Sequence, residues 1–191
     1  MDFAMTDEQE LLLESVREFC DRYFTEDVIK EMYETGDMPD EIAEAYRDAG
    51  FGLMGIPEEY GGIPCDKVTL GMMIEELYHS SGCNHILYQN SLTAFDIVEF
   101  GTPEQIQKYM DAYMETGWPL CSLSISEPGA GSDNRNMSCT AKKQDDGTYR
   151  LNGQKTWVTM GAKLPYTIVV AKDEDPSREN DKMSLWMIEM D

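Results

Sequence analysis

The residues best suited to chemistry lie in two short segments of the second half of the chain. Residues 124–133 have the sequence SISEPGAGSD, and residues 151–159 have the sequence LNGQKTWVT. In the first segment, Gly129 and Gly131 permit a left-handed backbone and let main-chain N–H groups come close to a ligand. Successive N–H groups in such a turn form a nest for an anion, including a phosphate. The first segment therefore predicts a phosphate cradle after a strand.

The second segment supplies an aromatic ring and a hydroxyl group. Trp157 and Thr159 are two residues apart, so a strand over residues 154–159 would place both on one face. A phosphate cradle beside a flat aromatic wall suits a large, flat, phosphorylated cofactor. A plainer interpretation remains open, because glycine-rich turns between strands usually bind nothing. Trp157 would then be a core aromatic of a barrel, and Thr159 an ordinary strand residue.

Two common phosphate motifs are excluded. The turn does not end in Gly-Lys-Ser or Gly-Lys-Thr, so it is not a P-loop. It also lacks the Gly-x-Gly-x-x-Gly pattern that opens a helix in dinucleotide-binding folds.

The first part of the chain is predicted to be helical. Thr6 with Gln9 and Thr102 with Gln105 match the capping-box pattern, and Pro103 stands at a first helical position. Apolar residues recur at helical spacing in residues 12–23, 42–49, 70–78, 88–98 and 106–113, and Pro39 opens the second of these stretches. These stripes are most simply explained as core packing.

The pattern changes near residues 118 and 119. Six short alternating or β-rich runs follow, at residues 120–126, 137–143, 148–151, 154–159, 166–171 and 183–190. Turn signals at residues 145–147 and 152–153 separate some of them. The sequence therefore predicts an α+β chain with two domains: an all-α domain over residues 1–118 and an antiparallel β domain over residues 119–191. Because the last run is apolar and would leave an unpaired edge, we expect the β domain to be incomplete.

Composition narrows the classes of partner. The net charge is −22, with 37 acidic and 15 basic residues, so the surface repels nucleic acid and anionic membranes. The five cysteines are odd in number and form no Cys-x-x-Cys pair, which favours a reducing cytoplasm. His79, Cys83 and His85 fit no standard zinc spacing, so we expect no metal site. The sequence has no apolar run of membrane-spanning length.

Several segments together resemble the acyl-CoA dehydrogenase family. Residues 124–133 and 151–159 resemble its two flavin-contacting signatures, in the same order. Residues 48–62, with the sequence DAGFGLMGIPEEYGG, resemble an element of its N-terminal domain, and residues 1–11 and 100–105 resemble two of its helix starts. The opening residues and residues 87–89 also resemble the crotonobetainyl-CoA reductase branch, which belongs to carnitine metabolism.

This resemblance implies a fold and a chain length. The family has an N-terminal helical domain, a middle β-barrel domain and a C-terminal helical bundle. We therefore expect residues 119–191 to be a truncated antiparallel barrel, the bundle to be missing, and the chain to be an N-terminal fragment of a protein about twice its length. The cofactor implied is FAD, and the reaction is α,β-dehydrogenation of an acyl-CoA thioester or its reverse.

The resemblance also implies site residues. FAD is expected to contact Leu123, Ser124, Ile125, Ser126, Gly131, Ser132, Trp157, Val158 and Thr159. Ser132 is expected to contact the acyl-CoA as well. Ser126 would lie near the flavin ring, Trp157 would pack against it, and Val158 and Thr159 would donate hydrogen bonds near its reactive edge. The family's catalytic base lies in the C-terminal domain, so no catalytic residue is expected in this chain. Glu127 is expected to be structural or to support the cofactor.

The resemblance implies partners too. They are an electron-transfer flavoprotein and further copies of the chain, in a cytoplasmic homotetramer or homodimer. This fragment alone is expected to be inactive. A hypothesis of a different class stays open, in which the chain is a non-catalytic acidic interaction module that uses the same fold. Leu123 and Met160 depart from residue types common in the family, which puts the acyl-chain preference in doubt.

Overall fold

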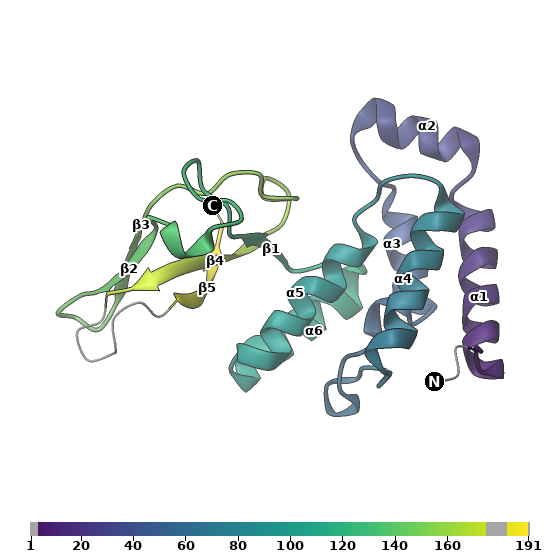
Figure 1. Ribbon diagram of the computed structural model, residues 1–191, viewed down its shortest axis with the longest axis horizontal. Coiled ribbons are helices and arrows are strands. Elements are labelled where there is room, and N and C mark those ends of the chain that lie inside the picture. Colours follow the sequence, from purple (N-terminus) through teal and green to yellow (C-terminus); the bar gives the residue numbers. More distant parts are fainter. Residues whose placement is uncertain (1–3, 175–182, 191) are drawn as a thin grey trace. The chain divides into compact units, whose positions relative to one another are not determined.

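Six α-helices are present in the described part of the first of two units into which the chain folds (Figure 1). The computed structural model describes residues 4–174 and 183–190, with only the backbone described for residues 89–91. The units are Met1–Trp118 and Pro119–Asp191. The helices are α1 (Asp7–Tyr23), α2 (Glu26–Thr35), α3 (Asp40–Asp48), α4 (Lys67–Ser81), α5 (Leu87–Phe100) and α6 (Pro103–Thr116).

Side-chain caps fix the starts of several helices. At α1 the Thr6 hydroxyl accepts a hydrogen bond from the Gln9 N–H, and the Gln9 side chain accepts one from the Thr6 N–H. Thr102 and Gln105 make the same pair at α6, where Pro103 takes a first-turn position. Both predicted capping boxes are therefore confirmed. Helix α2 was not predicted, because Met32 is its only buried residue and the apolar stripe is too short to recognise.

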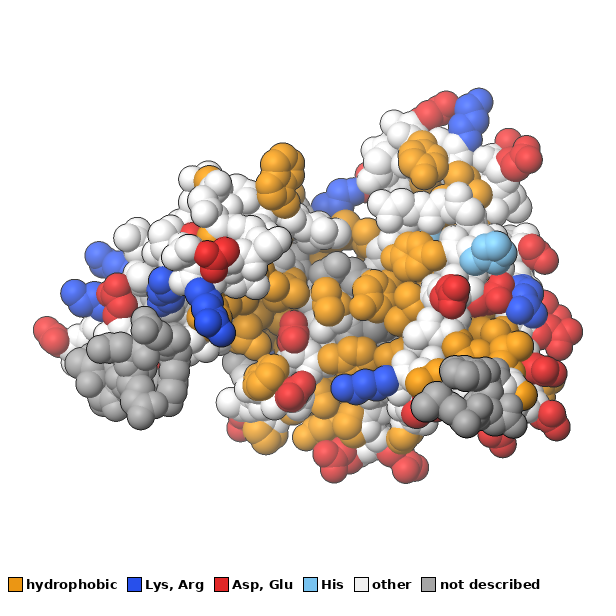
Figure 2. All heavy atoms as spheres, in the orientation of Figure 1, with side chains coloured by type: hydrophobic (Ala, Val, Ile, Leu, Met, Phe, Trp, Pro, Cys, Tyr) orange, Lys and Arg blue, Asp and Glu red, His pale blue; other side chains and the backbone are white. Residues whose placement is uncertain are grey.

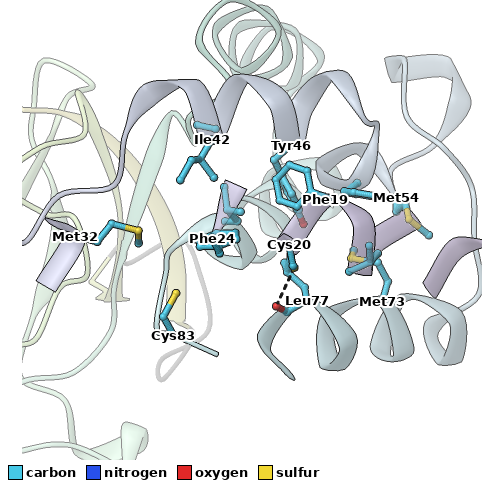
Figure 3. Close-up of a cluster of buried hydrophobic side chains, with 14 residues drawn as sticks. Phe19, Cys20, Phe24, Met32, Ile42, Tyr46, Met54, Met73, Leu77 and Cys83 are labelled. Atoms are coloured by element: carbon cyan, nitrogen blue, oxygen red, sulfur yellow. Dashed lines mark hydrogen bonds between the residues drawn. The ribbon is translucent and has the colours of Figure 1, made fainter. Parts of the chain in front are cut away.

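The core of the helical unit lies between α1, α3 and α4. Figure 3 shows Phe19 and Cys20 of α1 facing Met73 and Leu77 of α4, with Tyr46 of α3 nearby. Helices α1 and α4 run parallel, since contacts between them rise together in residue number. The Gln9 side chain donates to the Thr69 hydroxyl at 2.9 Å, and the Cys20 thiol donates to the Leu77 carbonyl at 3.6 Å. Figure 2 shows acidic side chains spread over the outside of this unit.

The loop that follows α3 is packed too closely for a side chain at several of its glycines. A Cβ at Gly52 would lie 1.8 Å from the Tyr113 hydroxyl oxygen, and one at Gly62 would lie 2.2 Å from the Ile56 carbonyl oxygen. Two glycines of the segment 48–62 are therefore required by packing against α6 and within the loop itself.

The second unit holds five described strands: β1 (Cys121–Ser124), β2 (Thr140–Lys143), β3 (Tyr149–Asn152), β4 (Tyr166–Asp173) and β5 (Met183–Glu189). Strand β4 has three partners. It pairs in parallel with β1, where Leu123 is opposite Ile168, and in parallel with β2, where Thr140 is opposite Lys172. It pairs antiparallel with β5 along seven residues, and β2 pairs antiparallel with β3.

The predicted antiparallel arrangement is wrong in this respect, because the sheet is mixed. Strands β1 and β2 reach β4 through connections that leave them parallel to it. Within the described ranges, no pairing closes the strands into a barrel. The alternating apolar pattern reports which face of a strand is buried, and it does not distinguish the direction of the neighbouring strand.

The predicted strand over residues 154–159 is also wrong. Trp157 has a φ of 59° and Met160 a φ of 60°, and no strand residue adopts such values. Asn152 and Gly153 do not make a hairpin turn either. Gly153 instead passes close to β2, where a Cβ would lie 2.6 Å from Cys139 Cα. The turn at Gly147, in contrast, joins β2 and β3 as expected.

All five cysteines are free thiols. Among the residues that the structure describes, no three His, Cys, Asp or Glu side chains gather as metal ligands. No helix in the described ranges has the length and apolar character needed to cross a membrane.

One buried titratable group gives a testable pH dependence. His85 is stacked between Phe24 and Tyr78, with ring centroids at 4.9 and 4.4 Å. Burial lowers the pKa of His85 from 6.5 to about 4. Between these pH values the unfolded chain binds a proton that the folded chain does not. The stability that neutral His85 contributes is therefore fully present above pH 6.5 and is lost as the pH falls towards 4.

We predict that His85→Phe weakens this acid sensitivity, because phenylalanine keeps the stacking and does not titrate. Denaturant unfolding at several pH values measures the difference in the free energy of unfolding between wild type and variant. That difference should change by up to about 3 kcal/mol across the window. Parallel pH profiles for the two proteins would contradict the prediction.

Candidate functional site

The two segments that carry the candidate site residues, 124–133 and 151–159, lie side by side in the β unit. The Thr156 N–H donates to the Ser126 carbonyl at 2.9 Å, and the Lys155 ammonium donates to the Ile125 carbonyl at 2.9 Å. The loop after β1 is therefore tied by two hydrogen bonds to the loop after β3.

Glu127 lies at the centre of this connection. Its carboxylate accepts hydrogen bonds from the N–H and hydroxyl groups of Ser138, from the Cys139 N–H at 2.9 Å and from the Lys155 ammonium at 2.9 Å. The side chain of Glu127 is 2% exposed, and that of Lys155 is 9% exposed. The pair thus joins both loops to the segment that leads into β2.

The electrostatics of Glu127 suit a structural anchor. Burial raises the pKa of its carboxyl group, but hydrogen bonds from Ser138, Lys155 and Cys139 outweigh burial and lower the pKa from 4.5 to about 2. A carboxylate with four donors and so low a pKa is a poor proton acceptor near neutral pH. Glu127 therefore has the properties of a support for the loops and lacks those of a catalytic base.

The glycine turn differs from the expected conformation. Glu127 and Ala130 exchange backbone hydrogen bonds at 2.9 and 3.2 Å, which closes a tight turn. Neither Gly129 nor Gly131 is among the residues with positive φ. The left-handed conformation that these glycines permit is therefore adopted at neither position. A Cβ on either residue would meet no protein atom within 4 Å, so the space above both glycines is open.

Trp157 is the most unusual residue of the site. It is 93% exposed and has a φ of 59°. A bulky residue in this region costs on the order of 1–3 kcal/mol, and such strain is concentrated at functional sites. The interpretation of Trp157 as a core aromatic of a barrel is contradicted by its exposure. A large apolar ring is thus exposed to solvent in the segment that is hydrogen-bonded to the loop of the glycine turn.

The other predicted residues divide by burial. Ser124 is buried, and its hydroxyl shares a hydrogen bond of 2.7 Å with Thr167, so its side chain serves the sheet. Four of the predicted residues are partly buried: Leu123, Ile125, Ser126 and Val158. Three are exposed: Gly131, Ser132 and Thr159.

Several polar groups around the turn lack protein partners. Within the described residues, the N–H and hydroxyl groups of Ser126 and Ser132 make no hydrogen bond, and neither does the Trp157 N–H. The hydroxyl oxygen of Thr156 is buried and is also without a partner there. These donors belong to the two hydrogen-bonded loops, which also carry the open turn and the exposed ring of Trp157.

Lys155 and Thr156 were assigned no role from the sequence. The side chain of Lys155 is 9% exposed and the hydroxyl oxygen of Thr156 is buried, whereas the flanking residues Gln154 and Trp157 are exposed. The sequence gives no signal for the role of Lys155, because its neighbours Gln154 and Thr156 are polar and do not predict burial. The sequence also does not show that Lys155 pairs with Glu127, 28 positions earlier.

The fold defines a chain of two units, a helical unit and a mixed-sheet unit in which two hydrogen-bonded loops carry the candidate site residues. Residues 6–116 match the N-terminal domain of acyl-CoA dehydrogenases, and residues 122–191 match the middle domain. The chain belongs to the acyl-CoA dehydrogenase family.

Individual relatives agree with this assignment. A probable acyl-CoA dehydrogenase of Escherichia coli, YdiO, is 37% identical over 189 residues, which is 99% of this chain and 49% of that protein. The structure of butyryl-CoA dehydrogenase from Megasphaera elsdenii superposes with a TM-score of 0.77 at 28% identity, covering 99% of this chain and 50% of the other. An acyl-CoA dehydrogenase from Geobacillus kaustophilus gives a TM-score of 0.81 at 28% identity, covering 100% and 50%. The chain thus spans about half the length of these relatives.

We predict that Glu127→Ala strongly destabilises the β unit. The substitution leaves the Lys155 charge buried and removes the acceptor for Ser138 and Cys139, at a cost of about 3–5 kcal/mol. Chemical denaturation followed by circular dichroism measures the loss. Glu189→Ala is the matched control, since Glu189 is exposed on β5. Its free energy of unfolding should change by less than about 0.5 kcal/mol. Equal effects of the two substitutions would show that Glu127 is not an anchor.

Proposed function

We propose that this chain forms the flavin-contacting half of an FAD-dependent acyl-CoA dehydrogenase or reductase. The observation that carries the proposal is Trp157, a strained and 93% exposed tryptophan in a loop bonded to the Ser126 loop. Packing within the described chain does not explain this conformation. A flat ligand stacked on the ring would cover the exposed side chain.

The residues around Trp157 suit FAD chemically. The isoalloxazine ring is flat and carries acceptors along one edge, which matches an aromatic face beside the unpartnered donors of Ser126 and Trp157. The space above Gly129 and Gly131 lets a ligand approach the backbone. The proposed contacts are Leu123, Ser124, Ile125, Ser126, Gly131, Ser132, Trp157, Val158 and Thr159, with Ser124 contributing through its backbone because its side chain is buried.

The chemistry of the complete protein divides between cofactor and chain. FAD, when bound, accepts hydride from the β-carbon of an acyl-CoA thioester, or returns it in the reductive direction. The residues of this chain hold and orient the cofactor and shield one of its faces. The Glu127 carboxylate is occupied by four hydrogen bonds and is therefore not assigned as the base that removes the α-proton. The resemblance to the family implies a base outside this chain.

The finer assignments rest on the resemblance. The proposed substrate class is a short acyl-CoA of the butyryl-CoA or crotonobetainyl-CoA type, with Ser132 as a contact. The exposure of Ser132 at the end of the turn leaves its hydroxyl accessible to a second ligand. An electron-transfer flavoprotein and a homotetramer or homodimer are proposed on the same basis. A cytoplasmic location is proposed from the five cysteines, which form no Cys-x-x-Cys pair.

A second function of a different class uses the same exposed ring. In this alternative the chain is a non-catalytic acidic interaction module, and Trp157 contacts a protein partner. It predicts that the complete protein binds no flavin. The set of unpartnered donors around the turn favours the cofactor.

The visible absorption spectrum of the complete protein tests the proposal. We expect flavin bands that bleach when a saturated short acyl-CoA is added. If the reductive direction holds, the reduced protein regains its bands on addition of crotonobetainyl-CoA. A colourless protein that cannot be reconstituted with FAD would favour the interaction module.

Trp157→Ala tests the ring contact itself. We predict that the dissociation constant of FAD rises by about tenfold or more, because a stacked aromatic pair and its buried area contribute over 1 kcal/mol. Fluorescence titration of the apoprotein measures it. The control is Tyr33→Ala, which removes an aromatic ring that is 68% exposed on the helical unit. An unchanged FAD affinity for Trp157→Ala would exclude stacking on this ring.

A further inference from the structure

The buried ammonium group of Lys155 has two recorded acceptors. One is the Glu127 carboxylate and the other is the main-chain carbonyl of Ile125, each at 2.9 Å. The side chain of Lys155 is 9% exposed, so water screens its charge little. A charged donor therefore contacts a backbone carbonyl in a largely dry environment.

The Ile125 carbonyl belongs to the same peptide unit as the Ser126 N–H. No peptide bond in the described residues is cis, so the two groups point in opposite directions. The N–H of Ser126 thus points away from Lys155. It makes no hydrogen bond to any described residue.

A hydrogen bond at one end of a peptide unit strengthens the other end. When a charged group donates to the carbonyl oxygen, the amide is polarised and its N–H becomes a stronger donor. The next peptide is held as well, since the Ser126 carbonyl accepts the Thr156 N–H at 2.9 Å. Ser126 therefore presents a donor that is both oriented and polarised.

Glu127 keeps this arrangement in place. The three donors from Ser138 and Cys139 hold the carboxylate, so Lys155 is drawn to a defined position between Glu127 and Ile125. The low pKa of about 2 keeps Glu127 charged, and the ion pair stays intact at physiological pH.

We propose that Lys155 is a positioning residue that tunes the cofactor through the Ile125–Ser126 peptide. By polarising this peptide it strengthens the Ser126 N–H as a donor to an electron-rich acceptor on the flavin ring. The bond grows stronger as the ring gains electrons, so Lys155 raises both FAD affinity and the flavin midpoint potential. This inference rests on the proposed function, because it requires FAD beside Ser126.

The test compares charge-removing and charge-retaining variants of the complete protein. Lys155→Met with Glu127→Gln removes both charges without leaving either one alone. Lys155→Arg keeps a cation, and Lys142→Met removes an exposed lysine of β2 as the matched control. The dissociation constant of FAD is measured by fluorescence, and the midpoint potential by dye-coupled reduction. Neither measurement depends on turnover.

We expect the double variant to bind FAD about five to ten times more weakly, the equivalent of one weakened hydrogen bond, and to have a more negative midpoint potential. Lys155→Arg should remain closer to wild type in potential than the double variant, and Lys142→Met should match wild type in both measurements. A change in affinity alone, with the potential unchanged, would reduce Lys155 to a structural role and overturn the proposal.

Two outcomes separate this inference from the proposed function. If the wild-type protein holds no FAD, the proposed function fails. If wild type binds FAD and the double variant keeps its affinity and potential, only the inference about Lys155 fails. Should the double variant not fold, Lys155→Gln with Glu127→Gln replaces it, because glutamine at position 155 is neutral and still donates to a carbonyl. It should lower the potential by a smaller amount, and an unchanged potential would contradict the proposal.

Discussion

The ion pair between Glu127 and Lys155 is the constraint on which the site depends. Both groups are almost fully buried, so each requires the other. Their shared hydrogen bonds reach three separate stretches of chain: the loop after β1, the loop after β3 and the entry to β2. Together with the Thr156–Ser126 hydrogen bond, the pair holds the loops after β1 and β3 close to each other.

A buried ion pair of this kind is a poor source of net stability. Removing two charges from water costs several kcal/mol per ion, and their attraction repays that cost only when further hydrogen bonds are present. Here Ser138 and Cys139 provide those bonds. The main effect is therefore on geometry. The pair fixes one arrangement of the loops, in which Trp157 keeps an unfavourable backbone conformation next to an open turn.

The parts of this structure that were predictable from sequence are those determined by local chemistry. The capping boxes at Thr6 and Thr102 and the helices behind them follow from contacts three or four residues apart. The two segments that carry the candidate site residues were recognisable because their residue types resemble those of the acyl-CoA dehydrogenase family. Strand direction was not predictable, since β1 meets β4 across more than forty residues. The left-handed conformation of Trp157 was not predictable either, because tryptophan has no local preference for it. Lys155 and Glu127 show the same limit, since only the fold brings them together.

The pairing of β1 with β4 has a consequence for how the molecule is made. Strand β4 is the partner of β1, β2 and β5, yet it lies at residues 166–173, near the end of the chain as described. The chain leaves the ribosome N-terminus first. The helical unit can therefore fold before β4, the strand that connects β1, β2 and β5, has been synthesised. The loop carrying Ser126 leaves the ribosome early and waits for some forty further residues before its strand has a neighbour. During that interval the exposed edge of β1 is open to wrong pairing, and the rate of synthesis of residues 125–173 sets how long it lasts.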